Sequence, residues 1–497
     1  MNSRSLTYLP TTVPLPIPEE ELLDLVNKGK DWALMHGAAM RSKKNFSADS
    51  LNFAPFSLLP STMTRKNFQH AVELQTIFQE LMHKVAYDKE FLTRCLKNTV
   101  LVDEFTAKLW QIYETVQKEG ETQPISLGLV RCDYMLQSCN AEEKETPTET
   151  NENPPCNWKL VEVNTIAAGF GWLGPASRLI QRYIMEEMNL HDRLQNLPDN
   201  NALSGLCEGM LEAWRLYANP KAFILIVVED VSYNICDQRF HQFRIRELNP
   251  NANVMRKNLT QIYNEATLNE NKELVINNQI VSVVYFRSGY EPCQYHGDNE
   301  WEARLLIERS RAIKCPNIQY HLAGCKKVQQ ELAKPGVLES FITDKDSIKA
   351  IKDVYVGIHG LEFDECGEHA INLALTNPEK YVLKPQREGG GNNIYGIEIK
   401  EYINKMKDSQ ERTAWILMER IFPPITKGYI VRPGEPVPPT ISEVVSEFGM
   451  YGVIIGDSKK IISNRQVGHM LRTKTATANE GGVASGLGAL DSPYLID

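Results

Sequence analysis

The sequence contains no apolar run long enough to cross a lipid bilayer. Its most conspicuous apolar run, Ala222–Val228, is far shorter than the roughly 20 residues that a transmembrane helix requires. The first ten residues, which end at Pro10, also lack the apolar core of a secretory signal peptide. We therefore expect a cytoplasmic protein with no membrane partner.

Cysteine pairs with metal-ligand spacing are missing as well. The ten cysteines are scattered along the chain, and none forms a Cys-x-x-Cys motif. Reduced thiols are the simplest explanation of this distribution, and it gives little support for a metal–thiolate site.

The sequence also has no excess of positive charge. Its net charge of −9 argues against nucleic acid as a partner, because nucleic-acid binding requires a basic surface. Any anionic ligand must therefore be bound by a local cluster of Lys and Arg. At 497 residues the chain is too long for one hydrophobic core, and about two to four domains are expected.

The richest motif in the sequence follows the short apolar run Tyr381–Leu383. Glycines and asparagines in a row can turn their backbone N–H groups toward an anion. Cations and a carboxylate stand beside them, a set that suits a nucleotide with bound magnesium. A flexible surface turn is the alternative, and the spacing matches neither a P-loop nor a dinucleotide fingerprint. The motif consists of Lys384, Pro385, Gln386, Arg387, Glu388, Gly389, Gly390, Gly391, Asn392 and Asn393.

A second candidate lies in the predicted strand Trp158–Ile166. Strand periodicity puts Leu160, Glu162 and Asn164 on one face. Two oxygen donors side by side suit a hard divalent cation, and Glu388 is a candidate third ligand. A half-exposed strand with a polar outer face is the alternative.

Two further strands end in polar residues. The run Pro124–Met135 predicts a buried strand in which Arg131 is a candidate carboxylate ligand, and a surface ion pair with Asp133 is the alternative. The extended run Val467–Lys474 places Arg472 and Lys474 on one face. A second glycine-rich loop, 479–488, follows it, and His469 is interpreted as a packed core residue.

Other segments predict the scaffold. Helical spacing of apolar residues over 67–118 indicates a helical layer, and residues flanking Gly456-Asp457 indicate a β-hairpin. The run 139–157 is interpreted as a solvated hairpin tip. Strands over Phe223–Val228 and Gln279–Phe286, joined by a helical segment, predict a parallel-sheet domain.

Two charged helices are also predicted. Trp301–Ser310 has the pattern of an amphipathic helix with ion pairs on its outer face. His321–Leu332 is expected to form one helix that carries Lys326 near its glycine. That lysine is either a phosphate ligand or a solvated helix residue.

Together these segments resemble the eukaryotic glutathione synthetase family of the ATP-grasp superfamily. The resemblance runs from Gly128 to Tyr494, and its strongest pieces are Lys384–Tyr395, Leu322–Gln330, Trp301–Ser310, Arg287–Tyr290 and Leu471–Ala484. It implies ATP-dependent joining of γ-glutamylcysteine to glycine, with magnesium as cofactor, by a homodimer.

The resemblance also implies a fold. It is a mixed α/β, circularly permuted ATP-grasp fold with an inserted parallel-sheet substrate-binding domain and a glycine-rich lid. The expected divisions are an N-terminal helical region with part of the core (1–218), the substrate domain (219–325), and the rest of the core (326–497). The expected lid consists of the loops 388–393 and 479–488.

Site residues follow from the resemblance by position. Magnesium would be bound by Glu162, Asn164 and Glu388, and the implied catalytic residues are Arg131, Lys384 and Arg472. ATP would be contacted by Glu162, Lys326, the whole motif Lys384–Asn393, Tyr395, Met418, Glu419, Arg420, Ile421, Glu447, Lys474 and Glu480. The peptide substrate or glycine would be contacted by Arg131, Ala167, Ala168, Gly169, Ser232, Tyr233, Asn234, Gln238, Arg287, Ser288, Gly289, Tyr290, Arg472, Val483 and Ala484.

The sequence departs from the family pattern at three places. Ala167-Ala168-Gly169 replaces a stretch that commonly offers serine hydroxyls, Glu480 stands where aspartate is frequent, and Ser232-Tyr233 also differ. We interpret these departures as changes in affinity. The alternatives are another ATP-grasp ligase with a different acceptor and a non-catalytic nucleotide-binding protein. A protein kinase is excluded because its ordered motifs are missing.

Overall fold

The central element of the fold is a mixed, largely antiparallel seven-stranded sheet. The structure, a computed structural model, describes residues 7–138, 157–387, 391–483 and 486–497. The long hairpin of β18 (Ile441–Gly456) and β19 (Ile461–Thr475) confirms the turn predicted around Gly456-Asp457. In order across the sheet, the strands are β17 (Thr426–Val431), β3 (Phe56–Ser57), β20 (Gly488–Asp491), β19 (Ile461–Thr475), β18 (Ile441–Gly456), β5 (Ser126–Gln137) and β6 (Asn157–Asn164).

A β-bulge in β6 changes the face on which its side chains lie. Asp133 pairs with Glu162, but the next residue, Tyr134, pairs with Leu160, so Val161 is the extra residue. Leu160 is buried in the core, whereas Glu162 and Asn164 line a cavity. The prediction that Leu160 shares their face is therefore wrong, because one inserted residue reverses the alternation of a strand.

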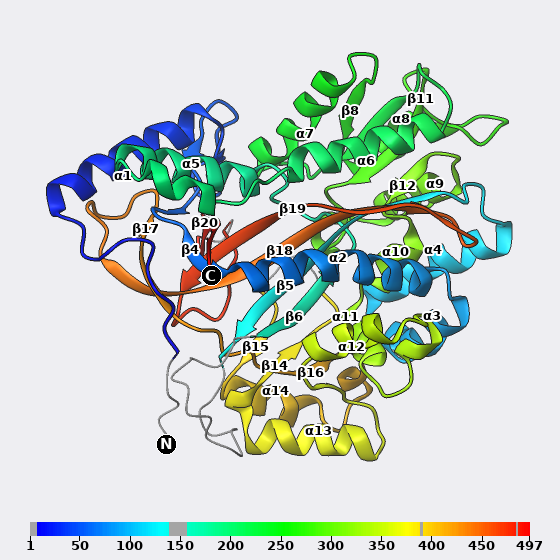
Figure 1. Ribbon diagram of the computed structural model, residues 1–497. Helices are drawn as coiled ribbons and strands as arrows, with labels where there is room; N and C mark the ends of the chain where they lie inside the picture. The colour runs from blue at the N-terminus through cyan, green and yellow to red at the C-terminus, as the bar shows by residue number, and fades with distance from the viewer. Residues whose placement is uncertain (1–6, 139–156, 388–390, 484–485) are drawn as a thin grey trace.

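Helices cover both faces of the central sheet. Thr64 is the N-cap residue of α2 (Arg65–Ala86), and its side-chain oxygen accepts a hydrogen bond from the backbone N–H of Asn67. The predicted helical layer over 67–118 is confirmed. It consists of α2 (Arg65–Ala86), α3 (Lys89–Leu96) and α4 (Glu104–Glu119), while α1 (Glu19–Met35), α5 (Leu173–Glu187) and α6 (Ala202–Leu216) lie above the sheet in Figure 1.

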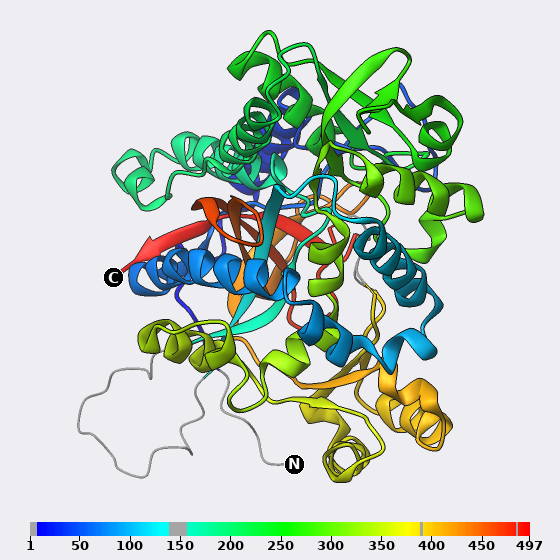
Figure 2. The same cartoon turned by 90° about the vertical axis from the view of Figure 1, so that its right-hand side faces the viewer.

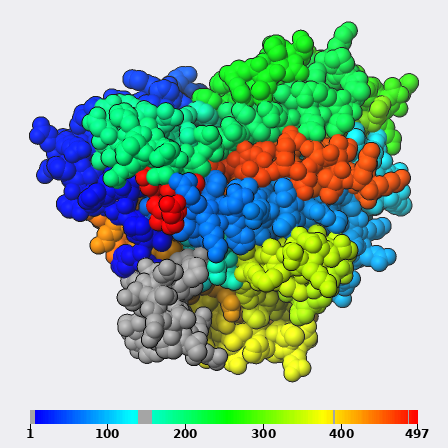
Figure 3. All heavy atoms as spheres, viewed as in Figure 1, coloured from blue at the N-terminus to red at the C-terminus, as the bar shows by residue number. Residues whose placement is uncertain are grey.

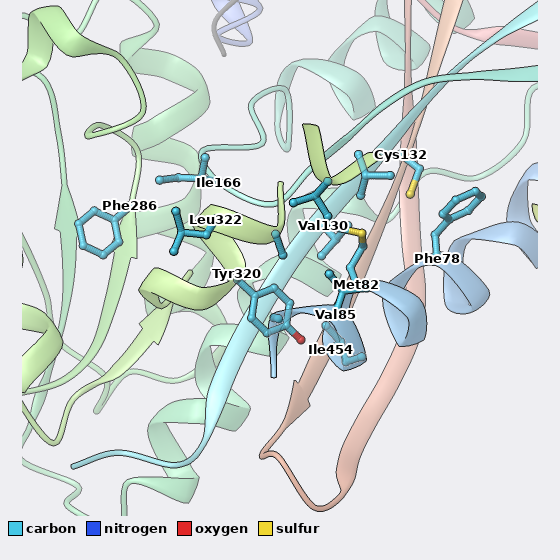
Figure 4. Packing of buried hydrophobic residues seen from close by; sticks show 14 of the residues in the cluster. Phe78, Met82, Val85, Val130, Cys132, Ile166, Phe286, Tyr320, Leu322 and Ile454 are labelled. Carbon is cyan, nitrogen blue, oxygen red and sulfur yellow. The ribbon is translucent and has the colours of Figure 1, made fainter. Parts of the chain in front are cut away.

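The main core lies between α2 and the sheet. Phe78, Met82 and Val85 of α2 point toward Cys132 of β5 and Ile454 of β18 (Figure 4). Their spacing of three and four residues is the apolar stripe of an amphipathic helix. On the face shown in Figure 3, α2 (blue) runs beside the orange hairpin strand across the middle of the molecule.

A second sheet of six strands forms the body coloured green in Figures 1 and 2. Four of its strands are parallel, which confirms the predicted parallel sheet. β8 and β12 were not predicted because they are only four and three residues long. The strands are β7 (Phe223–Val227), β8 (Val254–Lys257), β9 (Ala266–Leu268), β10 (Leu274–Ile276), β11 (Gln279–Phe286) and β12 (Ile313–Cys315), with α7 (Ile235–Leu248), α8 (Leu259–Glu265) and α9 (Asp298–Arg309).

A third sheet of four antiparallel strands lies on the opposite side of the central sheet (yellow and orange at the bottom of Figure 1). Its strand β14 ends at Lys384, directly before Pro385, as predicted. The elements are β13 (Ile358–Gly360), β14 (Tyr381–Lys384), β15 (Ile394–Tyr395) and β16 (Ile416–Glu419), with α13 (Glu365–Thr376) and α14 (Glu398–Met406).

Two helix predictions need correction. The expected single helix His321–Leu332 is two helices, α10 (Ile318–Ala323) and α11 (Lys326–Leu332), because the chain turns at Gly324-Cys325. In α9, the pair Arg304–Glu308 is buried instead of lying on the outer face, and the Arg304 guanidinium lies 4.0 Å from the ring centroid of Phe286. Remaining elements are β1 (Ala39–Met40), β2 (Asn52–Phe53), β4 (Ser61–Thr64), β21 (Pro493–Ile496) and α12 (Lys345–Val354).

None of the helices in the described ranges has the length and apolar character needed to traverse a bilayer. The eight cysteines in these ranges are free thiols. Within the same ranges, no group of three or more His, Cys, Asp or Glu side chains is arranged to bind a metal. The hairpin tip predicted over 139–157 lies outside the described residues, except for Asn157, which begins β6.

Candidate active site

Strands of the central and four-stranded sheets, together with segments that follow strands of the six-stranded sheet, line one cavity of about 1200 Å³. The predicted residues that line it are Arg131, Glu162, Asn164, Ala167, Gly169, Tyr233, Asn234, Gln238, Arg287, Ser288, Tyr290, Lys326, Lys384, Arg387, Gly391, Asn392, Asn393, Tyr395, Met418, Glu419, Arg420, Ile421, Glu447, Arg472, Lys474 and Glu480. The fold therefore brings together segments that lie more than three hundred residues apart in the chain, from Arg131 to Glu480.

Several predicted residues lie elsewhere. Ala168, Ser232, Gly289, Pro385, Gln386 and Val483 are described but do not line the cavity. Gln386 is an anchor, because its Oε1 accepts from the Lys327 backbone N–H at 3.0 Å and its Nε2 donates to the Ala414 carbonyl at 3.0 Å. Glu388, Gly389, Gly390 and Ala484 lie outside the described residues.

A carboxylate and two lysines form the centre of the cavity wall. The Lys326 Nζ lies 3.5 Å from Glu162 Oε2 and donates to the Arg387 carbonyl at 2.6 Å. The Lys384 Nζ donates to the Val161 carbonyl at 3.2 Å. Burial opposes ionisation of Glu162, but Lys326 and Lys384 outweigh it and lower its pKa to about 2. Glu162 is therefore an ionised oxygen donor at neutral pH.

Two lysines of the cavity, Lys384 and Lys474, are poorly hydrated cations. Burial lowers the pKa of Lys384, partly offset by the neighbouring charge of Glu162. Burial likewise lowers the pKa of Lys474, against the opposing effect of Glu447 and Glu480. Ammonium groups that have lost water interact strongly with an anion that replaces it, so this wall suits a polyphosphate.

Arginines line a further part of the cavity. Arg131 donates from Nε and Nη2 to the two carboxylate oxygens of Asp133 at 2.6 and 2.7 Å. The pair predicted as the alternative therefore exists, but it is buried and not on the surface. Arg472 is paired with Glu447, and its buried Nε has no hydrogen-bond partner in the described chain. Such an orphaned N–H is available to an anionic ligand.

Asn164 is oriented by the carboxylate of Asp133. Its Nδ2 donates to Asp133 Oδ2 at 3.0 Å, which directs the amide nitrogen toward Asp133 and turns the carbonyl oxygen away from it. Glu162 and Asn164 both line the cavity, and a carboxylate with an amide oxygen is a donor set that suits Mg²⁺.

The second glycine-rich loop contacts the first. Glu480 accepts hydrogen bonds from the Gly391 backbone N–H at 3.2 Å, from Asn393 Nδ2 at 3.0 Å and from the Tyr395 hydroxyl at 3.3 Å. The side chain of Glu480 therefore links the two loops across the cavity.

His469 behaves as the sequence predicts. It is buried between Phe68 and Phe448, with ring centroids 5.2 and 5.6 Å away. Burial and the charge of Arg178 lower its pKa to about 3. It is a neutral core residue at physiological pH.

Two polar residues near the cavity were missed. Glu229 lines it and accepts from Gln238 Nε2 at 3.0 Å and Ser232 Oγ at 3.4 Å. It directly follows the apolar run Ala222–Val228, and the strand-end rule that selected Arg131 would also have selected it. Asp237 accepts from the backbone N–H groups of Phe170 and Trp172, both at 2.9 Å. No sequence pattern indicates that role.

Comparisons with known proteins agree with one another. A family model described as eukaryotic glutathione synthase, ATP binding domain, matches residues 19–495. The chain is 40% identical over 468 residues to glutathione synthetase of Xenopus laevis, covering 94% of this chain and 95% of that protein. It is 38% identical over 480 residues to glutathione synthetase of Homo sapiens, covering 96% and 98%.

A solved structure resembles the fold. The glutathione synthetase-like effector GSS30 of Globodera pallida, in its apo form, superposes with a TM-score of 0.75 at 23% identity, over 97% of this chain and 98% of that one. At this identity the likeness concerns the mixed α/β fold alone.

Proposed function

The chain belongs to the eukaryotic glutathione synthetase family, and from this premise we propose that it joins γ-glutamylcysteine to glycine with consumption of ATP. It is thus an ATP-dependent ligase that forms a peptide bond. The observation that carries the proposal is the ionised Glu162 beside Lys326 and Lys384 in the shared cavity. A transferring phosphoryl group requires this combination of charges.

The proposed reaction has two steps. A carboxylate oxygen of the cysteinyl residue attacks the γ-phosphorus of ATP, the bond to the bridging oxygen breaks, and ADP leaves. The glycine amine then attacks the acyl carbon of this acyl phosphate. The bond between that carbon and the phosphate oxygen breaks, inorganic phosphate leaves, and the new amide nitrogen releases its surplus protons to solvent.

We assign the ATP-binding roles to the wall between the central and four-stranded sheets. Lys326, Lys384 and Lys474 would neutralise phosphate oxygens, because each lines the cavity. The buried side chains of Val382 and Met418, with the chain from Glu419 to Ile421, would surround the adenine.

Mg²⁺ fits the donor set of the cavity. Glu162 and Asn164, with Glu388, would bind the ion, and bound Mg²⁺ would neutralise negative charge on the phosphates. The fit rests on the ionised state of Glu162 and on the amide orientation of Asn164.

The peptide-binding roles fall on the arginine wall. Arg131, Arg287 and Arg472 would bind carboxylates, with Arg131 and Arg472 acting next to the reacting group together with Lys384. Gly481 and Gly482 line the cavity beside Arg472 and Lys474, and their small size favours glycine as the amine over a bulkier one.

We further propose the family's architecture for this chain. The six-stranded sheet would be the inserted substrate domain (219–325), flanked by core segments 1–218 and 326–497, with circularly permuted connectivity. The loops 388–393 and 479–488 would act as lids, a role supported by the contacts of Glu480 with Asn393 and Tyr395. The active form would be a homodimer.

The test is product analysis. The chain is incubated with ATP, Mg²⁺, γ-glutamylcysteine and one amine, which is glycine, alanine or β-alanine. We expect glutathione and ADP in equal amounts with glycine and much slower turnover with the other two amines. Faster turnover with β-alanine or alanine would assign the chain to a ligase with another acceptor, and no amine-dependent ADP release would refute ligation.

A further inference from the structure

The turn between β6 and α5 carries no hydroxyl side chain over Ala167–Phe170, yet its backbone is tightly bound. The Gly169 carbonyl accepts from two side chains of the central sheet. One donor is the hydroxyl of Tyr451 in β18, and the other is Arg131 Nη1 of β5 at 3.1 Å. Tyr451 is fully buried, so without this carbonyl its hydroxyl would lose the acceptor to which it donates.

The carbonyl of the preceding residue, Ala168, is bound by an arginine that follows a strand of the six-stranded sheet. Ala168 O accepts from Arg287 Nη1 at 3.3 Å, directly after β11. Arg287 also lies 3.2 Å from the carboxylate of Asp237, which in turn accepts from the Phe170 backbone N–H. Two successive carbonyls of the turn therefore bind two guanidinium groups, Arg131 and Arg287, that belong to different sheets.

The backbone of the turn needs these contacts. Ala167 and Phe170 have φ values of 51° and 73°, in the left-handed region that residues with a side chain rarely adopt. Such a conformation persists only where the surroundings fix it. Loss of one donor should therefore shift the turn, and with it the separation of the two arginines.

We propose that Tyr451 is a positioning residue: through the Gly169 carbonyl, its hydroxyl sets the spacing of Arg131 and Arg287 for a ligand with two carboxylates. The inference rests on the proposed function, since γ-glutamylcysteine carries one carboxylate on each residue. Arg131 and Arg287 line the cavity, whereas Tyr451 lies behind it. Tyr451 also interacts with the Arg131 side chain, so it acts on the substrate through the turn and through Arg131, without contacting the ligand itself.

Tyr451→Phe is the most direct test, because it removes one oxygen atom and leaves the ring in place. We expect the KM for γ-glutamylcysteine to rise about fivefold to tenfold, the effect of one hydrogen bond of about 1 kcal/mol or slightly more. The KM values for ATP and glycine should stay within about twofold.

A second substrate distinguishes a change in the spacing of Arg131 and Arg287 from a general loss of activity. The analogue 4-aminobutanoyl-cysteine lacks the glutamyl carboxylate but keeps the reacting one. With only one carboxylate the spacing of the arginines no longer matters, so Tyr451→Phe should change the KM for this analogue less than twofold. Equal increases for both substrates, or an increase for ATP, would overturn the proposal.

The matched control is Tyr87→Phe, since the Tyr87 hydroxyl donates to the Pro124 carbonyl at 3.1 Å and does not line the cavity. It should leave every KM unchanged. Gly169→Ala provides a second variant, because an added Cβ would meet Arg287 Nη2 at 3.3 Å. It should reproduce the selective loss for the two-carboxylate substrate.

The outcome remains separable from that of the proposed function. If the wild-type chain forms no glutathione, calorimetric titration with γ-glutamylcysteine and the one-carboxylate analogue replaces kinetics. Selective weakening of the two-carboxylate ligand in Tyr451→Phe would still support the spacing role. Unchanged affinity would refute it.

Discussion

Lys326 and Glu162 face each other across the boundary between two parts of the fold, with 3.5 Å between Nζ and Oε2. Glu162 belongs to β6 of the central sheet, and Lys326 is the first residue of α11. Both side chains are largely buried. A buried charge is stable only beside an opposite charge. In a bound magnesium nucleotide, the cation would face Glu162 and the phosphates would face Lys326.

Replacing Glu162 by Gln should lower kcat by about 100-fold or more, because the cavity loses the ionised oxygen donor assigned to Mg²⁺ and phosphate. The Mg²⁺ concentration for half-maximal activity should rise. Steady-state kinetics over a Mg²⁺ titration measures both effects. Asp230→Asn is the control, since Asp230 also lines the cavity but pairs with His296. Wild-type turnover in Glu162→Gln would remove its assigned role.

Arg472 and Lys474 should affect different substrates although they lie two residues apart on β19. Arg472→Ala should raise the KM for γ-glutamylcysteine by about tenfold or more, since it removes a charge-assisted contact. Lys474→Ala should mainly raise the KM for ATP. Steady-state kinetics with each substrate varied in turn measures this division. If Arg472→Ala changed only the ATP dependence, the assignment would be reversed.

Gly324→Ala should destabilise the fold by about 1–3 kcal/mol, because its Cβ would lie 2.3 Å from Thr165 Oγ1. The double variant Gly324→Ala/Thr165→Ala should recover most of the loss, since the clashing oxygen is gone. Thermal melting of the single and double variants measures the coupling. Gly428→Ala, whose Cβ would meet no atom closer than 4.0 Å, is the control. If Gly324→Ala were as stable as Gly428→Ala, the close packing of Gly324 against Thr165 would be contradicted.

Acid should destabilise the protein in part through His469. Its folded-state pKa is about 3, below the value of about 6.5 in an unfolded chain. Between these values the unfolded state binds the proton and the folded state does not, so stability falls as pH falls through this window. In the wild type the free energy of unfolding falls between pH 7 and pH 5, and His469→Phe should make this fall smaller by about 2 kcal/mol.

Urea unfolding at pH 7 and at pH 5 tests this effect. His191→Phe is the control, since His191 is exposed. An identical pH response in His469→Phe and the wild type would show that His469 does not contribute to acid sensitivity.

The sequence predicted much of the scaffold for local reasons. Mostly apolar runs such as Gln279–Phe286 became strands with the predicted bounds, and Pro385 ended β14. Strand periodicity correctly placed Arg472 and Lys474 on the cavity wall. These features depend on residues next to one another in the chain.

The errors come from contacts between distant segments. The bulge at Val161 is set by pairing with β5, and nothing in the run Trp158–Ile166 reveals it. The break at Gly324 follows from close packing against Thr165. Tyr451 carries no local signal, because the Gly169 carbonyl that it contacts lies far away in the chain.

Oxygen transfer tests the central claim most directly, that the cavity brings a substrate carboxylate to the γ-phosphate of ATP. γ-Glutamylcysteine labelled with ¹⁸O in its cysteinyl carboxylate is turned over with ATP and glycine, and the released phosphate is analysed by mass spectrometry. One labelled oxygen per phosphate is the predicted result. Unlabelled phosphate formed alongside glutathione would contradict the acyl-phosphate route and the assignment of this cavity to it.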